Sequence, residues 1–173
     1  MEKLIENKST TNINITNNNN KIITNNLIVN INSFGKENLT HITDKEYKNY
    51  LSTYFKGFIK FIEKVHFDDN MPENKNICIT NLKSKYVCIF DNDKWITKEK
   101  KDVIDKFIST KYNILADKCD EYEENNEIDE KILNNFTEFA KNYRDEEAQK
   151  NTKHNITMLL YNNRDKINMK QIC

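Results

Sequence analysis

The sequence predicts an α+β fold: a small antiparallel three-stranded β-meander packed by about four helices, with an Asn-rich, β-prone N-terminal arm. Three observations lead to this prediction. Apolar residues recur at helical spacing on both sides of a central stretch, residues 76–97. That stretch contains three short runs of β-branched and aromatic residues. The first thirty residues are rich in Asn, so we expect an arm over residues 1–33 and one α+β domain over residues 34–173.

The composition argues against several broad classes of protein. There are 27 basic and 27 acidic residues, so no net charge attracts nucleic acid or anionic lipid. No apolar run reaches the roughly 18 residues of a membrane span, and we expect no membrane partner. The four cysteines are scattered without a CxxC pair, which favours an intracellular, reducing compartment over secretion.

The arm permits two interpretations, a disordered tail or an assembly strand. Isoleucines alternate with polar residues and resume after a run of four Asn, and such strand-period segments have one apolar face that needs a partner. One chain cannot bury that face over this length, so we expect homo-oligomerisation through the arm. The candidate oligomerisation residues are Ile13, Ile15, Ile22, Ile23, Leu27, Val29 and Ile31.

The first helix is expected over residues 44–66. Thr43 and Glu46 have the spacing of a capping box, and a wide aromatic stripe follows at i, i+3, i+4 and i+7. Such a stripe is usually core. Lysines occupy the other faces, either as a solvated surface or as phosphate contacts: Lys45, Lys48, Lys56, Lys60 and Lys64.

The meander is expected over residues 76–97. A first loop centred on Lys83 places Ile77 opposite Ile89 and Cys78 opposite Cys88, with Ile79–Val87 and Thr80–Tyr86 continuing the ladder. A two-residue turn at Asn92-Asp93 then places Phe90 opposite Trp95 and Ile89 opposite Ile96. This register sorts Ile77, Ile79, Val87, Ile89 and Ile96 onto one face and Cys78, Tyr86, Cys88, Phe90 and Trp95 onto the other. We expect both faces to be covered by helices.

Three further helices are expected over residues 98–119, 128–148 and 152–167, the first capped by Thr97. The acidic stretch 117–130 is interpreted as a solvated connection between helices. It lacks the glycine of an EF-hand loop, which argues against a calcium site. The last two helices could be continuous, because residues 144–153 are polar but compatible with a helix.

No catalytic, metal-binding or cofactor-binding residue is predicted, and no small-molecule ligand is evident. Gly35 and Gly57 are the only glycines, too few and too isolated for a phosphate loop or nucleotide fingerprint. Cys78 and Cys88 are expected to be structural thiols rather than zinc ligands. The segment with most chemical character is the loop entering the sheet, whose candidate residues are His66, Phe67, Pro72, Glu73, Asn74 and Asn76.

The same loop carries a resemblance. The pattern H-F-x4-P-E-N-x-N-I from His66 to Ile77 follows a Phe34-Gly35-Lys36-Glu37-Asn38-Leu39 segment. Together they resemble a set of uncharacterised paralogous proteins of giant viruses of the mimivirus kind. The resemblance covers most of the chain after residue 33. Members of that set often carry a C2H2 zinc-finger-like segment before this module, which implies an association with nucleic acid. No such pattern precedes the module in this chain.

The resemblance and the residues together lead to one expected function and two alternatives. We expect a non-enzymatic viral interaction or assembly module that self-associates through the arm, in the cytoplasm or virus factory of an infected host cell. The first alternative is a regulatory nucleic-acid-binding protein. The remote alternative is an HNH-like nuclease, in which His66 would activate water and an Asn would orient the loop.

Overall fold

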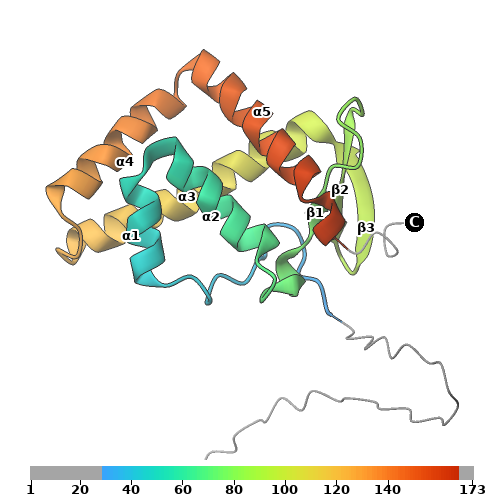
Figure 1. The fold of residues 1–173 in the computed structure, drawn as a ribbon, viewed down its shortest axis with the longest axis horizontal. Coiled ribbons are helices and arrows are strands. Elements are labelled where there is room, and N and C mark those ends of the chain that lie inside the picture. Colours follow the sequence, from blue (N-terminus) through green and yellow to red (C-terminus); the bar gives the residue numbers. More distant parts are fainter. Residues whose placement is uncertain (1–28, 168–173) are drawn as a thin grey trace, which may run out of the picture.

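The computed structural model describes residues 29–167. Within them the chain forms five α-helices and a three-stranded antiparallel sheet of order β1-β2-β3, which confirms the predicted α+β class and meander. Figure 1 shows the helices packed together with the sheet at one end of the molecule. No helix in the described part of the chain is long and apolar enough to cross a membrane.

The predicted helix over residues 44–66 is wrong as one element, because it is two helices. Thr43 and Glu46 form the expected capping box, and α1 runs over Asp44–Ser52. Tyr54 then takes a left-handed φ of 51°, and α2 runs over Tyr54–Phe67. The break brings the rings of Tyr47 and Tyr50 to 5.9 and 5.8 Å from Phe61. In a straight helix, eleven residues would separate Tyr50 from Phe61 by about 16 Å along the axis. The aromatic stripe therefore packs against itself.

The sheet follows the predicted register where its strands pair. β1 (Ile77–Cys78) pairs with β2 (Tyr86–Asp91) through Ile77–Ile89 and Cys78–Cys88. β2 pairs with β3 (Lys94–Glu99) through Ile89–Ile96 and Phe90–Trp95, which confirms the turn at Asn92-Asp93. The ladder of β1 ends at Cys78, so the predicted pairs Ile79–Val87 and Thr80–Tyr86 do not belong to it.

The two faces of the sheet differ in burial. The core face buries Ile77, Ile79, Val87 and Ile89. On the other face Cys78 is buried, and its strand, β1, contacts α5. Away from β1, the side chains of that second face are open or half-buried, and Tyr86 is 53% exposed. Among the described residues, the expectation that helices cover both faces therefore holds for the core face but, on the second face, only at β1.

The remaining helices differ from prediction mainly at their ends. α3 (Lys100–Glu124) takes up the first part of the acidic stretch expected to be a connection, and only residues 125–129 connect it to the next helix. It begins after Glu99, because Thr97 belongs to β3. α4 (Glu130–Tyr143) and α5 (Glu146–Asn162) replace the helices expected over residues 128–148 and 152–167. Asp129 and Asp145 cap them, and the turn at Arg144-Asp145 shows that they are not continuous.

Candidate functional site

The predicted loop residues lie together at the junction of α2 and the sheet. His66 and Phe67 end α2, Pro72–Asn74 form a short 3-10 turn, and Asn76 directly precedes β1. His66, Asn74 and Asn76 are fully buried, and Phe67 nearly so. Pro72 and Glu73 are half-buried. Polar side chains at this depth need hydrogen-bond partners within the protein.

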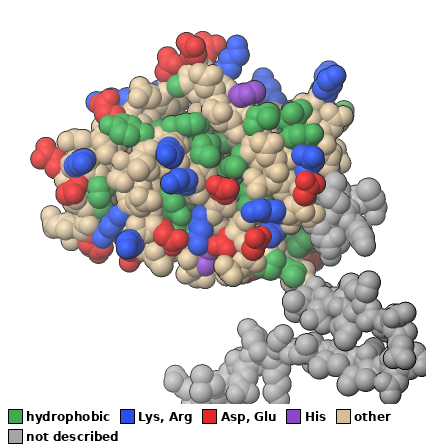
Figure 2. Space-filling view, in the orientation of Figure 1, with side chains coloured by type: hydrophobic (Ala, Val, Ile, Leu, Met, Phe, Trp, Pro, Cys, Tyr) green, Lys and Arg blue, Asp and Glu red, His purple; other side chains and the backbone are tan. Residues whose placement is uncertain are grey.

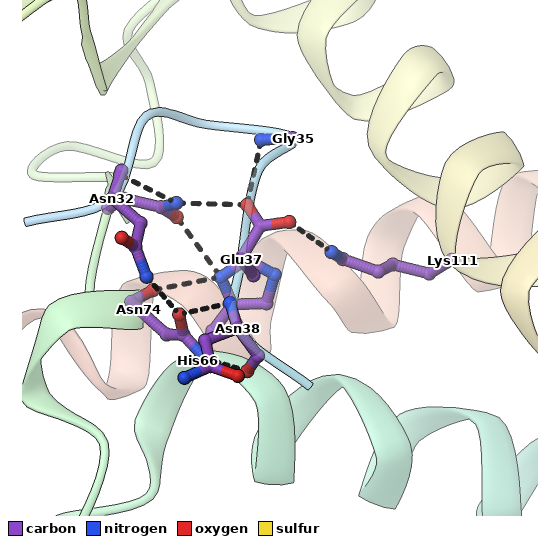
Figure 3. A network of polar contacts seen from close by, with 8 residues as sticks. Asn32, Gly35, Glu37, Asn38, His66, Asn74 and Lys111 are labelled. Carbon is purple, nitrogen blue, oxygen red and sulfur yellow. Dashed lines mark hydrogen bonds and ion pairs between the residues drawn. The ribbon is translucent and has the colours of Figure 1, made fainter. Parts of the chain in front are cut away.

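Those partners come from the segment that leads out of the N-terminal arm. The Asn74 side chain accepts hydrogen bonds from Asn32 Nδ2 and from the backbone N–H of Asn38, both at 2.9 Å, and donates to Asn38 O at 2.7 Å. One amide thus bonds both backbone groups of Asn38. In Figure 3, Asn74 and His66 lie on one side of this segment, and Lys111 of α3 reaches it from the other.

Asn76 holds the same segment at a second point. Its Nδ2 donates to Asn32 O at 3.1 Å and to Glu37 Oε1 at 2.9 Å. The backbone N–H of Asn32 donates to Glu73 O at 2.7 Å. Both backbone groups of Asn32 are therefore bonded to the loop, and the chain has a fixed position where the arm joins the body.

A buried ion pair closes the network on the side of α3. Lys111 Nζ lies 2.7 Å from Glu37 Oε2, and both side chains are at most 3% exposed. Glu37 Oε1 also accepts from Gly35 N at 2.8 Å. Burial alone would raise the pKa of the Glu37 carboxyl. The charge of His66, once that ring is protonated, the charge of Lys111, and hydrogen bonds from Lys111 and Asn76 together lower that pKa below its usual value.

His66 fills the centre of the network as a neutral ring. Its Nδ1 lies 3.2 Å from both Asn74 O and Asn76 Oδ1. Both atoms accept when Asn76 Nδ2 donates to the arm segment, which assigns the hydrogen to Nδ1. The ring packs 5.0 Å from that of Phe107 on α3. Burial, followed by the charge of Lys111, lowers the pKa of His66 to about 3.

We call this network the polar anchor: Asn32, Glu37, Asn38, His66, Asn74, Asn76 and Lys111. Its bonds are internal to the chain, and they join the arm segment, the α2–β1 loop and α3. His66 is fully buried, and so is its Nε2, the nitrogen that would have to accept a proton, so the ring is not placed to activate solvent water as the nuclease alternative requires. An HNH nuclease also needs a downstream metal-binding histidine, and His154, the only histidine after His66 in the sequence, is exposed on α5.

Elsewhere on the described part of the molecule, fewer polar side chains converge on one point than in the polar anchor. A hollow of about 670 Å³ lies between residues 37–44 and α3. Three of the four acidic residues that line it already have partners: Glu37 pairs with Lys111 at 2.7 Å, Asp44 accepts from Tyr122 at 2.6 Å and Glu121 pairs with Lys118 at 2.6 Å. Over residues 29–167, no group of three or more His, Cys, Asp or Glu is placed to hold a metal ion.

The sequence pointed to three of the seven anchor residues and missed the other four. His66, Asn74 and Asn76 were candidates, whereas Asn32, Glu37, Asn38 and Lys111 were not. One signal could have found Lys111. It lies on the apolar stripe of α3 at helical spacing from Phe107, Ile108 and Leu115, and a lysine there needs a buried counter-ion.

The arm residues fall largely outside the described part of the chain. Ile13, Ile15, Ile22, Ile23 and Leu27 lie beyond it. Val29 and Ile31 are described, and they are half-buried without strand structure. The predicted oligomerisation surface therefore remains a prediction from sequence.

Comparison with known proteins gives no family. No protein-family model, curated protein or solved structure matches this chain.

Proposed function

We propose that this chain is a non-enzymatic interaction module that self-associates through its N-terminal arm, with the polar anchor fixing the root of the arm. The observation that carries the proposal is the number of buried bonds on that root. Both backbone groups of Asn32, both of Asn38 and the carboxylate of Glu37 are bonded within 7 residues of chain.

A simple connection has no need of such bonds, because a surface loop can hydrogen-bond to water. Burying Glu37 and Lys111 also costs desolvation free energy, so the pair is a poor device for stability alone. Buried polar groups of this kind can instead specify one arrangement among several. Here the arrangement specified is the place and direction in which the arm leaves the body.

The resemblance to giant-virus paralogues gives the proposal its biological setting. The shared H-F-x4-P-E-N-x-N-I pattern contains three anchor residues, His66, Asn74 and Asn76. The role proposed for this chain is assembly within an infected host cell, in the cytoplasm or virus factory.

Light scattering of the full-length chain tests the proposal. We expect the unmodified chain to be larger than a monomer of 20.7 kDa. A variant with Ile13, Ile15, Ile22 and Ile23 each replaced by Asn should be monomeric, because the apolar alternation is lost. The matched control replaces four of the intervening Asn residues, 17–20, by Ser and should keep the mass of the unmodified chain. An arm variant of unchanged mass would disprove the role of the arm.

The alternative of nucleic-acid binding depends on the lysines of the first two helices. Lys48 pairs with Glu127, and Lys64 pairs with Asp68, so two of the five are already neutralised by carboxylates. Figure 2 shows basic and acidic side chains interspersed over the visible face. A gel-shift assay at low and moderate salt decides: binding that weakens with salt would favour this alternative.

A further inference from the structure

β3 is an edge strand of the sheet. Within the described residues the sheet has the order β1-β2-β3, so β2 pairs on one side of β3 and no described strand pairs on the other. An edge strand presents a row of backbone N–H and C=O groups that can pair with a further strand. Self-association through a β-prone arm needs such an acceptor.

The direction of these backbone groups follows from the bonds of β2. Phe90 directs both backbone groups toward β1, donating to Asn76 O and accepting from Phe34 N. Since direction alternates along a strand, Ile89 and Asp91 point toward β3 and pair with Ile96 and Lys94. The bond from Lys100 N to Lys85 O continues this alternation. Trp95 and Thr97 therefore direct their backbone groups outward, at the open edge.

The side chains beside this edge form an apolar strip on the less covered face of the sheet. Phe90 and Trp95 pack edge to face with centroids 5.7 Å apart and are half-buried. Cys88 lies opposite the exposed Thr97 on the same face, and Tyr86 continues the strip. A strand added beyond β3 would bring its own side chains beside Trp95 and Thr97 and cover part of the strip.

Residues 12–16 of the arm fit this edge best. Their sequence, Asn-Ile-Asn-Ile-Thr, alternates polar and apolar residues and carries no charge. Pairing of two β3 strands is less favourable, since it gathers Lys94 and Lys98 of both copies along one junction. Seventeen residues separate Ile15 from Asn32, and this length of chain reaches at most roughly 60 Å from the polar anchor. That reach is sufficient for contact with a neighbouring molecule.

We propose that residues 12–16 of one copy add as a fourth strand to the β3 edge of a second copy, with Ile13 and Ile15 on the face of Trp95. This inference rests on the proposed self-association and names its acceptor surface. The polar anchor fixes the root of the donor arm, and the edge at Trp95 and Thr97 receives it. The exchange is reciprocal in a symmetric dimer.

Thr97→Pro tests the acceptor edge in the full-length chain. Proline lacks the outward N–H but leaves the bonds from Ile96 and Lys98 to β2 intact, and proline is tolerated at such edge positions. Thr97→Ala is the matched control because it keeps the N–H. We expect Thr97→Pro to weaken self-association at least about tenfold, and Thr97→Ala to leave it unchanged. Circular dichroism and thermal melting show whether each variant is folded.

A mixing experiment decides whether the arm and the edge belong to different molecules. It uses only the arm of Thr97→Pro, so its result remains valid even if the β3 edge of that variant is partly unfolded. Ile13→Asn/Ile15→Asn has a defective arm and an intact edge, the reverse of Thr97→Pro. We expect each variant alone to be monomeric and their mixture to form a heterodimer through one arm and one edge. Trp95, the only tryptophan, reports the pairing through its emission in the mixture, since Ile13 and Ile15 would cover it.

The outcomes separate this inference from the proposed function. A wild-type oligomer whose mass is unchanged in folded Thr97→Pro overturns the β3 edge as acceptor and leaves self-association standing. A monomeric wild type overturns both. If the wild type is monomeric and its Trp95 emission differs from that of Ile13→Asn/Ile15→Asn, the arm pairs with the β3 edge of its own chain. That result also overturns the proposal.

Discussion

At the scale of residues, the polar anchor contains a buried positive charge, that of Lys111, which would be destabilising in the core without its pairing with Glu37. Lys111 lies on the apolar stripe of α3, and its ammonium group is matched by Glu37 at 2.7 Å. Burial lowers the pKa of Lys111, while Glu37 opposes the shift. Glu37 is in turn bonded by Gly35 and Asn76. Removal of one charge therefore leaves the other buried with incomplete compensation.

Lys111→Met should destabilise the fold strongly. Breaking one partner of a buried ion pair costs about 3–5 kcal/mol of unfolding free energy, because the remaining charge is uncompensated. The double variant Lys111→Met/Glu37→Gln should be more stable than Lys111→Met alone, since the remaining amide is neutral and still accepts from Gly35. Urea denaturation measures both values. A loss below 1 kcal/mol for Lys111→Met would show that the pair is not buried as described.

Stability should fall as pH decreases from neutrality, first through His66. Its pKa is lowered from 6.5 to about 3, so between these pH values His66 binds a proton in the unfolded state but not in the folded state. This contribution is complete above pH 6.5 and is lost as the pH falls from 6.5 toward 3. Glu37, whose pKa is lowered from its usual 4.5, adds a second loss as the pH falls below 4.5.

Denaturation at pH 7.0, 6.0 and 5.0 measures the first of these two losses. His66→Gln is the matched variant because it keeps a side-chain N–H donor and cannot titrate. The unmodified chain should lose more stability over this interval than His66→Gln does. Equal slopes for the two proteins would contradict the assignment of His66 as a buried neutral ring.

At the scale of elements, the close approach of α1 and α2 depends on Gly57. A Cβ at this position would overlap the carbonyl oxygen of Tyr50 and lie 2.7 Å from Thr53 Oγ1. The corner at Thr53 thus has room for a backbone hydrogen only. Asn135 of α4 donates to Ser52 O at 2.8 Å and holds the end of α1 at the same corner.

Gly57→Ala should therefore destabilise the protein more than Gly35→Ala. Overpacking against backbone costs about 1–3 kcal/mol or more, since the Tyr50 carbonyl cannot move freely. Gly35 has a φ of 86° but open space around its Cα, so alanine there costs only about 1–2 kcal/mol of backbone strain. Thermal melting of both variants gives the comparison. A neutral Gly57→Ala would show that the helix corner opens easily.

The sequence predicts the sheet well and the first helix poorly, for identifiable reasons. Alternation along β2 fixes the register, because a slip by one residue would expose Val87 and Ile89. The break at Thr53–Tyr54 has no proline, and Gly57 lies three residues later. It arises from packing of Tyr47 and Tyr50 on Phe61, which is a tertiary effect that helical periodicity does not encode.

At the scale of the whole molecule, the anchor joins parts that lie far apart in the sequence. Asn32 and Asn76 are separated by 44 residues, and Glu37 and Lys111 by 74. The polar residues of the segment after the arm follow no period, so the loop from His66 to Asn76 could be singled out but not Asn32, Glu37 and Asn38. The proposed function assigns these long-range bonds to one task, which is holding the arm where it meets the body.

The molar mass of the unmodified full-length chain tests the central claim most directly. Light scattering over a hundredfold range of concentration should give a multiple of 20.7 kDa that falls to 20.7 kDa on dilution. Such a concentration dependence is the mark of reversible association between copies. A folded, monodisperse species of 20.7 kDa at every concentration would contradict self-association, and with it the role proposed for the arm.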